Sequence, residues 1–403
     1  NAVATVGLTE SLLTLVFAVA LGVSMSTTAM VARRIGEKDH AGAGVAAGQA
    51  ILLGTAISIA IGLPAFFFAR ELLQMMAAPA DLVAEGWRYT AIVLGSNVVV
   101  MLLFINNAIF RGAGDASIAM RVLWMSNLIN LVMDPCLIFG WGPFPELGLT
   151  GAGYSTLVGR SFGVAYQLWV LMSGSARVKV AARDLMVVPA ILKSLVRVSS
   201  TGVLQFAIAH SSWIVLVRFI SSFGSVAVAG YTIGIRIFIF VVLPSWGLSG
   251  AAATMVGQNL GAKKPERAEK AVWLTGFYNS IYMGLIAVLF LLIPAQIVGL
   301  FTSDPEVARH AIDCLRIVAL GNLFYAFGMV MVQAFNGAGD TVTPTWINVI
   351  GFWLCEIPLA WALAYPVGWG VRGVFASIPI AECLITAIGL FMFMKGTWKE
   401  KKI

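Results

Sequence analysis

The sequence predicts an all-α polytopic membrane protein built from two pseudo-symmetric helix bundles. Of its 403 residues, 59% are hydrophobic and 11% are charged, whereas soluble domains carry about 25% charged residues. The mean hydropathy is +0.90. Apolar runs of about 20 residues, long enough to cross a bilayer as helices, recur along the whole chain. Motifs of the first half also return in the second half.

The duplication is visible at three places. Residues 22–36 (GVSMSTTAMVARRIG) return at 247–261 (GLSGAAATMVGQNLG), about 225 residues later. The tetrad GAGD of 112–115 returns at 337–340, and GLTG of 148–151 returns as GVRG of 370–373. Both copies run in the same chain direction, which predicts two similar lobes with a site between them, as in many transporters. Asp115 and Asp340 end the GAGD turns, and each can cap the helix that follows.

Apolar runs and turn residues together predict eleven helices. We expect them at 8–32, 42–69, 84–110, 117–140, 149–173, 195–223, 228–257, 268–300, 308–335, 343–366 and 371–394. Basic residues gather in the loops of one side, at 33–38, 177–197, 263–270 and 395–402. The positive-inside rule makes this side cytoplasmic. We therefore expect residue 1 outside and the C-terminus inside, in a plasma membrane such as the bacterial inner membrane.

An odd number of helices conflicts with a clean duplication. Shifted back by the repeat offset, the helix at 195–223 would have its counterpart before residue 1. We expect a fragment of a twelve-helix protein that lacks the first helix, and a cleaved signal peptide is the competing interpretation. The expected domains are an N-terminal lobe at 1–175, a cytoplasmic linker at 176–197 and a C-terminal lobe at 198–403.

Several classes of function are not indicated by the sequence. The four cysteines stand singly in apolar segments, the three histidines are dispersed, and no metal-ligand spacing is present. The sequence contains no GxxxxGK[ST] motif, so it does not suggest a nucleotide-driven pump. The net charge of +7 reflects membrane topology rather than nucleic-acid binding. We expect a monomer in the lipid bilayer, with neither enzyme activity nor a bound metal.

The motifs resemble those of the multidrug and toxic compound extrusion (MATE) transporters. The pattern G-x-S-x₆-V-x₄-G occurs in both lobes, and the two GAGD turns, Asn130-x-x-x-Asp134-Pro135 and GLTGAGYST at 148–156 add to it. The resemblance covers essentially the whole chain. It implies two six-helix bundles around a central cavity. It also implies export of organic cations and other amphipathic compounds in exchange for Na⁺ or H⁺, with no other cofactor.

Other functions of the same fold stay open at this point. Lipid-linked oligosaccharide flippases share the fold, and a metabolite exporter would show the same pattern. A channel is the alternative from a different class. It would favour rings of like charge or a filter motif, and the sequence shows neither.

Asp134 is the main candidate for binding the coupling cation. A charge inside the bilayer costs about 2.5–3.5 kcal/mol, so an acid in an apolar span is a functional hypothesis by default. Asn127, Asn130 and Asp134 share one helix face. Carboxylate and amide oxygens suit Na⁺, and protonation would neutralise the acid. Pro135 would loosen the backbone and free a carbonyl.

The resemblance adds Thr156, beside Ser155, to Asn130 and Asp134 as a cation site. The first-helix Asp of that site has no counterpart in this chain. A polar face that packs the lobe interior is the alternative interpretation. Other family members carry acids in the first and fourth helices of the C-terminal lobe. The corresponding stretches 206–213 and 324–327 contain none, so we expect that second site to be missing.

Four further charged residues lie in apolar segments. Glu356 is expected to act in coupling or in lobe packing. Arg160 and Glu382 hold equivalent repeat positions with opposite charge. Arg160 is expected to be the counter-ion of Asp134 or, alternatively, to pair with Glu382. Arg316 is expected to pair with Asp313 three residues earlier.

Aromatic residues of the first two C-terminal helices are the predicted lining of the substrate cavity. In the family these helices face the cleft, and aromatic rings suit flat cations. The predicted lining residues are Phe206, Trp213, Tyr231 and Phe238, with His210 as a titratable neighbour. Packing in the core or against lipid is the alternative for each of them.

Overall fold

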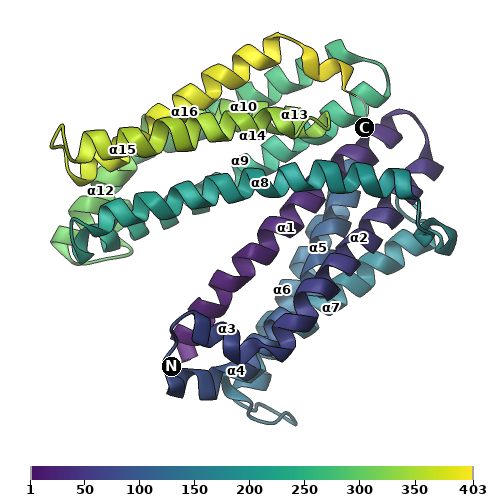
Figure 1. Cartoon of the computed structure of the whole chain (residues 1–403), viewed down its shortest axis with the longest axis horizontal. Coiled ribbons are helices and arrows are strands. Elements are labelled where there is room, and N and C mark those ends of the chain that lie inside the picture. Colours follow the sequence, from purple (N-terminus) through teal and green to yellow (C-terminus); the bar gives the residue numbers. More distant parts are fainter. Residues whose placement is uncertain (1, 402–403) are drawn as a thin grey trace. The chain divides into compact units, whose positions relative to one another are not determined.

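The computed structural model describes residues 2–401, and these residues contain helices and turns but no strand. The chain divides into two compact units, one ending at Val203 and the other beginning at Leu204. Figure 1 shows each unit as a bundle of long helices. The all-α fold predicted from composition is confirmed.

The first unit contains eight complete helical elements and the beginning of α8. They are α1 (Ala2–Gly36), α2 (His40–Phe67), α3 (Ala69–Met75), α4 (Ala80–Gly95), α5 (Asn97–Ala113), α6 (Ala116–Ile138), α7 (Gly148–Ser173) and the 3₁₀ helix η1 (Ala182–Leu185). Helix α8 (Pro189–Ser221) begins in this unit and ends in the next. The most extensive packing is between α6 and α7 and between α1 and α5.

The second unit repeats this arrangement with more interruptions. Its elements are α9 (Ser225–Gly261), α10 (Pro265–Leu292), α11 (Pro294–Gly299), α12 (Pro305–Ala319), α13 (Asn322–Gly337), α14 (Val342–Asn348), the π-helix η2 (Val349–Glu356), α15 (Ile357–Ala364), α16 (Val371–Met394) and the 3₁₀ helix η3 (Thr397–Glu400). Helices α9, α10 and α16 each pack against α13, and α12 packs mainly against α9.

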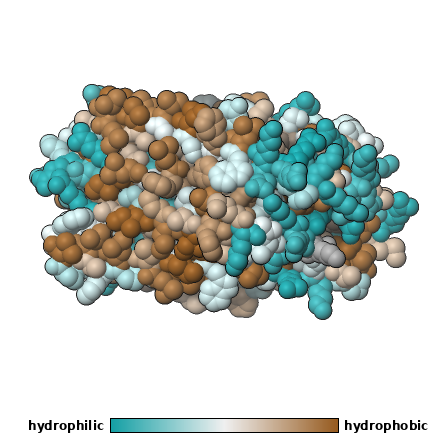
Figure 2. Space-filling model, turned by 90° about the horizontal axis from the view of Figure 1, so that it is seen from above, coloured by the Kyte–Doolittle hydropathy of each residue, from teal (hydrophilic) through white to brown (hydrophobic). Residues whose placement is uncertain are grey.

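The apolar helices are long enough to cross a membrane. Among residues 2–401, nine are long and apolar enough to do so, and α12 with α13 makes a tenth span bent by 59°. Helix α7, with 26 residues, is the remaining predicted span and falls outside this apolar set. Apolar side chains cover a broad band of the face in Figure 2, with polar side chains gathered at its ends.

Helix ends and breaks differ from the predictions at several places. The predicted helix 84–110 is broken at Ser96 into α4 and α5, and 308–335 is broken into α12 and α13. Helix α8 begins at Pro189, inside the stretch predicted as a linker, because proline is well suited to the first turn of a helix. Breaks at serine and glycine leave the hydropathy pattern almost unchanged, which is why the sequence did not reveal them.

The repeated GAGD turns need glycine at the same place. Gly114 has φ of 85° and Gly339 has φ of 82°, values that glycine adopts at little cost. Asp340 lies one residue before Thr341, the N-cap of α14, and its carboxylate accepts from the main-chain N–H and the hydroxyl of Thr343 in the first turn. The prediction for Asp115 was wrong. Its carboxylate instead accepts from the main-chain N–H of Arg177 at 2.9 Å, which ties down the segment after α7.

Candidate functional site

A stripe of small residues on α7 lets α6 pack closely against it. Buried small residues recur at every fourth position and so lie on one helix face: Gly151, Ser155, Gly159 and Gly163. A Cβ atom at Gly159 would lie 2.7 Å from the main-chain oxygen of Ser126 on α6. Small residues at this spacing commonly bring membrane helices together. The close approach places the polar residues of α6 against α7.

Asn130 and Ser155 connect the two helices through two hydrogen bonds. Asn130 Nδ2 donates to Ser155 Oγ at 2.9 Å, and the Ser155 hydroxyl donates to the main-chain oxygen of Asn130 at 3.2 Å. Ser155 is fully buried. The side-chain nitrogen of Asn130 is therefore bound by Ser155, the chain neighbour of Thr156.

Asp134 lies one turn after Asn130 on α6. Its side chain is half-buried, whereas Asn127 is exposed, so the predicted polar face is only partly turned inward. Within residues 2–401, Asp134 makes no hydrogen bond and no ion pair with another residue. Its carboxylate oxygens are thus available to a cation or a proton.

Tyr89 of α4 links the charged residues of this unit. Its phenol lies within electrostatic reach of Glu10, Asp134 and Arg160. Sequence reasoning overlooked Tyr89 and Glu10. The signal for Glu10 was present, because it is an acid within the apolar helix α1, as Asp134 is within α6. A tyrosine in an apolar span gives no comparable signal.

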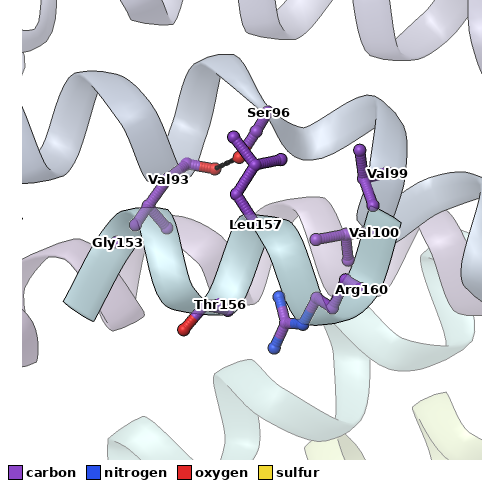
Figure 3. A pocket seen from close by; sticks show the side chains of 8 residues that line it. All are labelled: Val93, Ser96, Val99, Val100, Gly153, Thr156, Leu157 and Arg160. Atoms are coloured by element: carbon purple, nitrogen blue, oxygen red, sulfur yellow. Dashed lines mark hydrogen bonds between the residues drawn. The ribbon is translucent and has the colours of Figure 1, made fainter. Parts of the chain in front are cut away.

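Arg160 and Thr156 line a small pocket where the helix broken at Ser96 faces α7. The pocket is lined by Val93, Ser96, Val99, Val100, Gly153, Thr156, Leu157 and Arg160. Figure 3 shows Thr156, Leu157 and Arg160 projecting from one helix, opposite the bend at Ser96. The predicted direct pair of Arg160 with Asp134 does not form within the described residues. Arg160 instead interacts electrostatically with Tyr89. Asp134 also acts on Tyr89, so both charges share this tyrosine as a neighbour.

In the second unit, the structure brings together two acids that the sequence treated separately. Glu356 at the end of η2 is 5% exposed, and Glu382 in the middle of α16 is 9% exposed. The hydroxyl of Ser212 on α8 donates to Glu356 Oε2 at 2.7 Å. Each acid lies in the other's electrostatic field. Glu356 is therefore not an isolated acid.

The predicted cavity aromatics divide into two groups. Tyr231 and Phe238 are buried in the core of the second unit, where Tyr231 stacks on Phe375 and Phe238 contacts the ring of Tyr325 edge-on. Both rings pack inside this unit, and a place in a substrate cavity stays a prediction. His210 and Trp213 are exposed, with ring centroids 5.7 Å apart.

Phe206 is half-buried on α8. One contact joins the exposed and buried aromatic groups, because Trp213 Nε1 donates to the Tyr231 hydroxyl at 2.8 Å. Phe206, His210 and Trp213 are thus the members of the predicted set that a bound molecule could reach from the surface of this unit.

Comparison with known proteins places this architecture in context. The family model MatE matches residues 1–136 and 203–362. The probable multidrug resistance protein NorM of Thermotoga maritima is 26% identical, with 100% of this chain and 87% of that protein covered. The probable multidrug resistance protein YoeA of Bacillus subtilis is 23% identical over 100% of this chain and 88% of its own length. A crystal structure of MATE in the straight conformation has a TM-score of 0.91 at 24% identity, covering 99% of this chain and 89% of that one.

Proposed function

Because the chain belongs to the MatE family of membrane transporters, we propose that it exports drugs as a secondary antiporter. The substrates are organic cations and other amphipathic compounds, which leave the cell in exchange for inward Na⁺ or H⁺. Two related proteins, of which the alignment covers 87% and 88%, are named as probable multidrug resistance proteins, which supports this substrate class. A bacterial inner membrane with the C-terminus inside is the proposed location.

The observation that carries the proposed coupling is the setting of Asp134. The acid is half-buried in an apolar helix and is not bound by another described residue. The charge of Asp134 acts on Tyr89 of α4, and Tyr89 in turn interacts with Arg160 of α7. In the proposed cycle, a cation from outside neutralises Asp134, the N-terminal unit rearranges, and substrate is released outward by alternating access. A membrane potential adds about 2.3 kcal/mol per charge per 100 mV to this exchange.

The coupling role of Asp134 can be tested by transport in proteoliposomes. Ethidium transport by the parent chain and by Asp134→Asn is measured with a Na⁺ gradient and a pH gradient imposed separately. One gradient should drive transport by the parent, and the variant should lose that driven component. Trp124→Leu is the matched control, since Trp124 is 72% exposed on the same helix. Unchanged driven transport in Asp134→Asn would remove Asp134 from the mechanism.

A second measurement separates exchange from channel flow. Labelled ethidium outside the vesicles should enter faster when unlabelled ethidium is present inside. After releasing labelled ethidium inside, an antiporter can return to the outward-facing state with unlabelled ethidium bound. A channel would show no such acceleration, and that result would exclude the proposed exchange.

A further inference from the structure

The second unit holds two acids inside its apolar helices. Glu356 lies in the span Val342–Ala364 and Glu382 in the span Val371–Met394. Both side chains are more than nine-tenths buried. Glu382 makes no hydrogen bond or ion pair with any residue of the range 2–401. A buried carboxylate without a partner is costly, so a ligand is needed to explain why it is tolerated.

The local backbone brings the two acids together. Glu356 ends the π-helix η2, and the N–H of Ile357 bonds to the oxygen of Phe352, five residues earlier. Pro358 follows, and it has no N–H to continue the regular pattern. Single π-turns within α-helices often occur at functional sites. Gly351 packs against Ile385 of α16, which allows η2 and α16 to approach closely.

The groups around the acids carry no compensating positive charge. Those facing the acids from other helices are Ser212 on α8, Tyr231 on α9 and Tyr325 on α13. Cys355 and Cys383 flank the acids on their own helices. Within the described residues, no lysine, arginine or histidine contributes to the field at either carboxylate. Two negative charges side by side in such an interior strongly oppose each other.

The internal repeat shows that this charge pattern is specific to the second unit. Glu382 aligns with Arg160 of the first unit (382 − 160 = 222). In the first unit this position is a fixed cation, Arg160, which interacts with Tyr89, and Tyr89 also lies in the electrostatic field of Asp134. The second unit has an acid at the same repeat position, so its balancing positive charge must come from solution.

A proton fits this place better than a metal ion. Hard cations usually take six or more oxygen ligands. Here the surroundings offer two carboxylates and one hydroxyl, and Tyr231 already accepts a bond from Trp213. No group of three or more His, Cys, Asp or Glu residues in the described range could hold a metal ion.

We propose that Glu356 and Glu382 form a proton-binding site in the apolar interior of the second unit. The Ser212 hydroxyl orients Glu356 by donating to Oε2. The site belongs to the second unit alone and is separate from Asp134. It binds its proton without substrate, so its test does not depend on the proposed export of drugs.

The test is an infrared pH titration of the purified chain in lipid nanodiscs, without substrate or Na⁺. The band followed is the C=O stretch of protonated carboxyl groups, assigned to glutamate by ¹³C-glutamate labelling. In the parent chain a glutamate band should persist at neutral pH and disappear at alkaline pH. The double variant Glu356→Gln/Glu382→Gln should lose this band. Each single variant should shift its midpoint by about one pH unit or more toward acid, because the like charge is removed.

Controls and contrary outcomes are defined by the same spectra. Glu146→Gln, in an exposed loop position, and Asp134→Asn should leave the band unchanged. The proposal is overturned if the labelled parent shows no such band at neutral pH, which requires no variant to fold. It is also overturned if the band survives in the folded double variant, or if Na⁺ removes it at constant pH.

Discussion

Asn130 on α6 and Ser155 on α7 hold each other through two hydrogen bonds, of 2.9 Å and 3.2 Å, inside the N-terminal unit. The pair lies one turn from Asp134, so it fixes the part of α6 that carries the candidate coupling acid. Its geometry depends on the small residues of α7, which let the two helices touch. A change at this contact should therefore affect stability and, in the proposed mechanism, coupling as well.

Removing the Ser155 hydroxyl should destabilise the chain. Ser155→Ala eliminates both bonds at a fully buried position, and bonds between membrane helices contribute about 0.6–2 kcal/mol. The loss should appear as a lower midpoint of unfolding by sodium dodecyl sulfate in mixed micelles. Ser173→Ala is the control, because Ser173 is exposed near the end of the same helix. Equal midpoints for the two variants would contradict the inferred role of the pair.

A methyl group at Gly159 should force α6 and α7 apart. Alanine favours a helix over glycine by about 1 kcal/mol, but the new Cβ would lie 2.7 Å from the Ser126 oxygen. Overpacking typically costs about 1–3 kcal/mol, so Gly159→Ala should be destabilising in the same unfolding assay. Gly7→Ala is the control, since nothing lies within 4 Å of its new Cβ. It should be neutral or stabilising, and a stabilising Gly159→Ala would refute the close contact.

The membrane spans could be predicted because apolar length determines them almost alone. Hydropathy indicated most of the long helices, with α7 less apolar than the rest, and the repeat indicated two units of similar construction. The breaks at Ser96 and between α12 and α13 could not be predicted in this way, because a bend changes the direction of a helix without changing its composition.

Contacts between helices distant in sequence were the least predictable feature. Asp313 was expected to pair with Arg316 at helical spacing, yet it accepts two bonds from Arg372 at 2.8 Å and 3.2 Å. Glu356 and Glu382 were identified singly as buried charges, but the structure places Glu382 in the electrostatic field of Glu356, where Gly351 of η2 packs against Ile385 of α16. Local spacing predicts only local partners, and a tertiary pair is decided by which helices pack together.

The C-terminal segment should be held more by Trp398 than by the ion pair of Lys399 with Glu269. Trp398 is fully buried and stacks on Phe393 with ring centroids 4.8 Å apart. Replacing a buried tryptophan with alanine costs about 3–5 kcal/mol. The neighbouring Lys399 pairs with Glu269 at 2.6 Å, but both side chains are about one-third exposed, and such pairs contribute about 0–1 kcal/mol.

Thermal unfolding in detergent distinguishes these two contributions. Trp398→Ala should lower the melting temperature clearly, whereas Lys399→Ala should change it little at physiological salt. Raising the salt concentration should reduce the Lys399→Ala effect further, since the pair is screened. A larger effect from Lys399 than from Trp398 would mean that the ion pair, not the ring, anchors the segment.

A methyl group at Gly153 should reduce transport without reducing stability. Gly153 lines the pocket with Thr156 and Arg160, and a Cβ there would lie 3.2 Å from the Tyr89 ring. The ring needs to move only slightly, and the helix gains up to about 1 kcal/mol from alanine. Gly153→Ala should therefore unfold at the same or a higher detergent concentration than the parent, unlike Gly159→Ala.

Because Tyr89 connects Asp134 electrostatically to Arg160, the same variant should show reduced gradient-driven ethidium transport in proteoliposomes. Parent-like transport in this folded variant would show that the position of Tyr89 does not affect coupling.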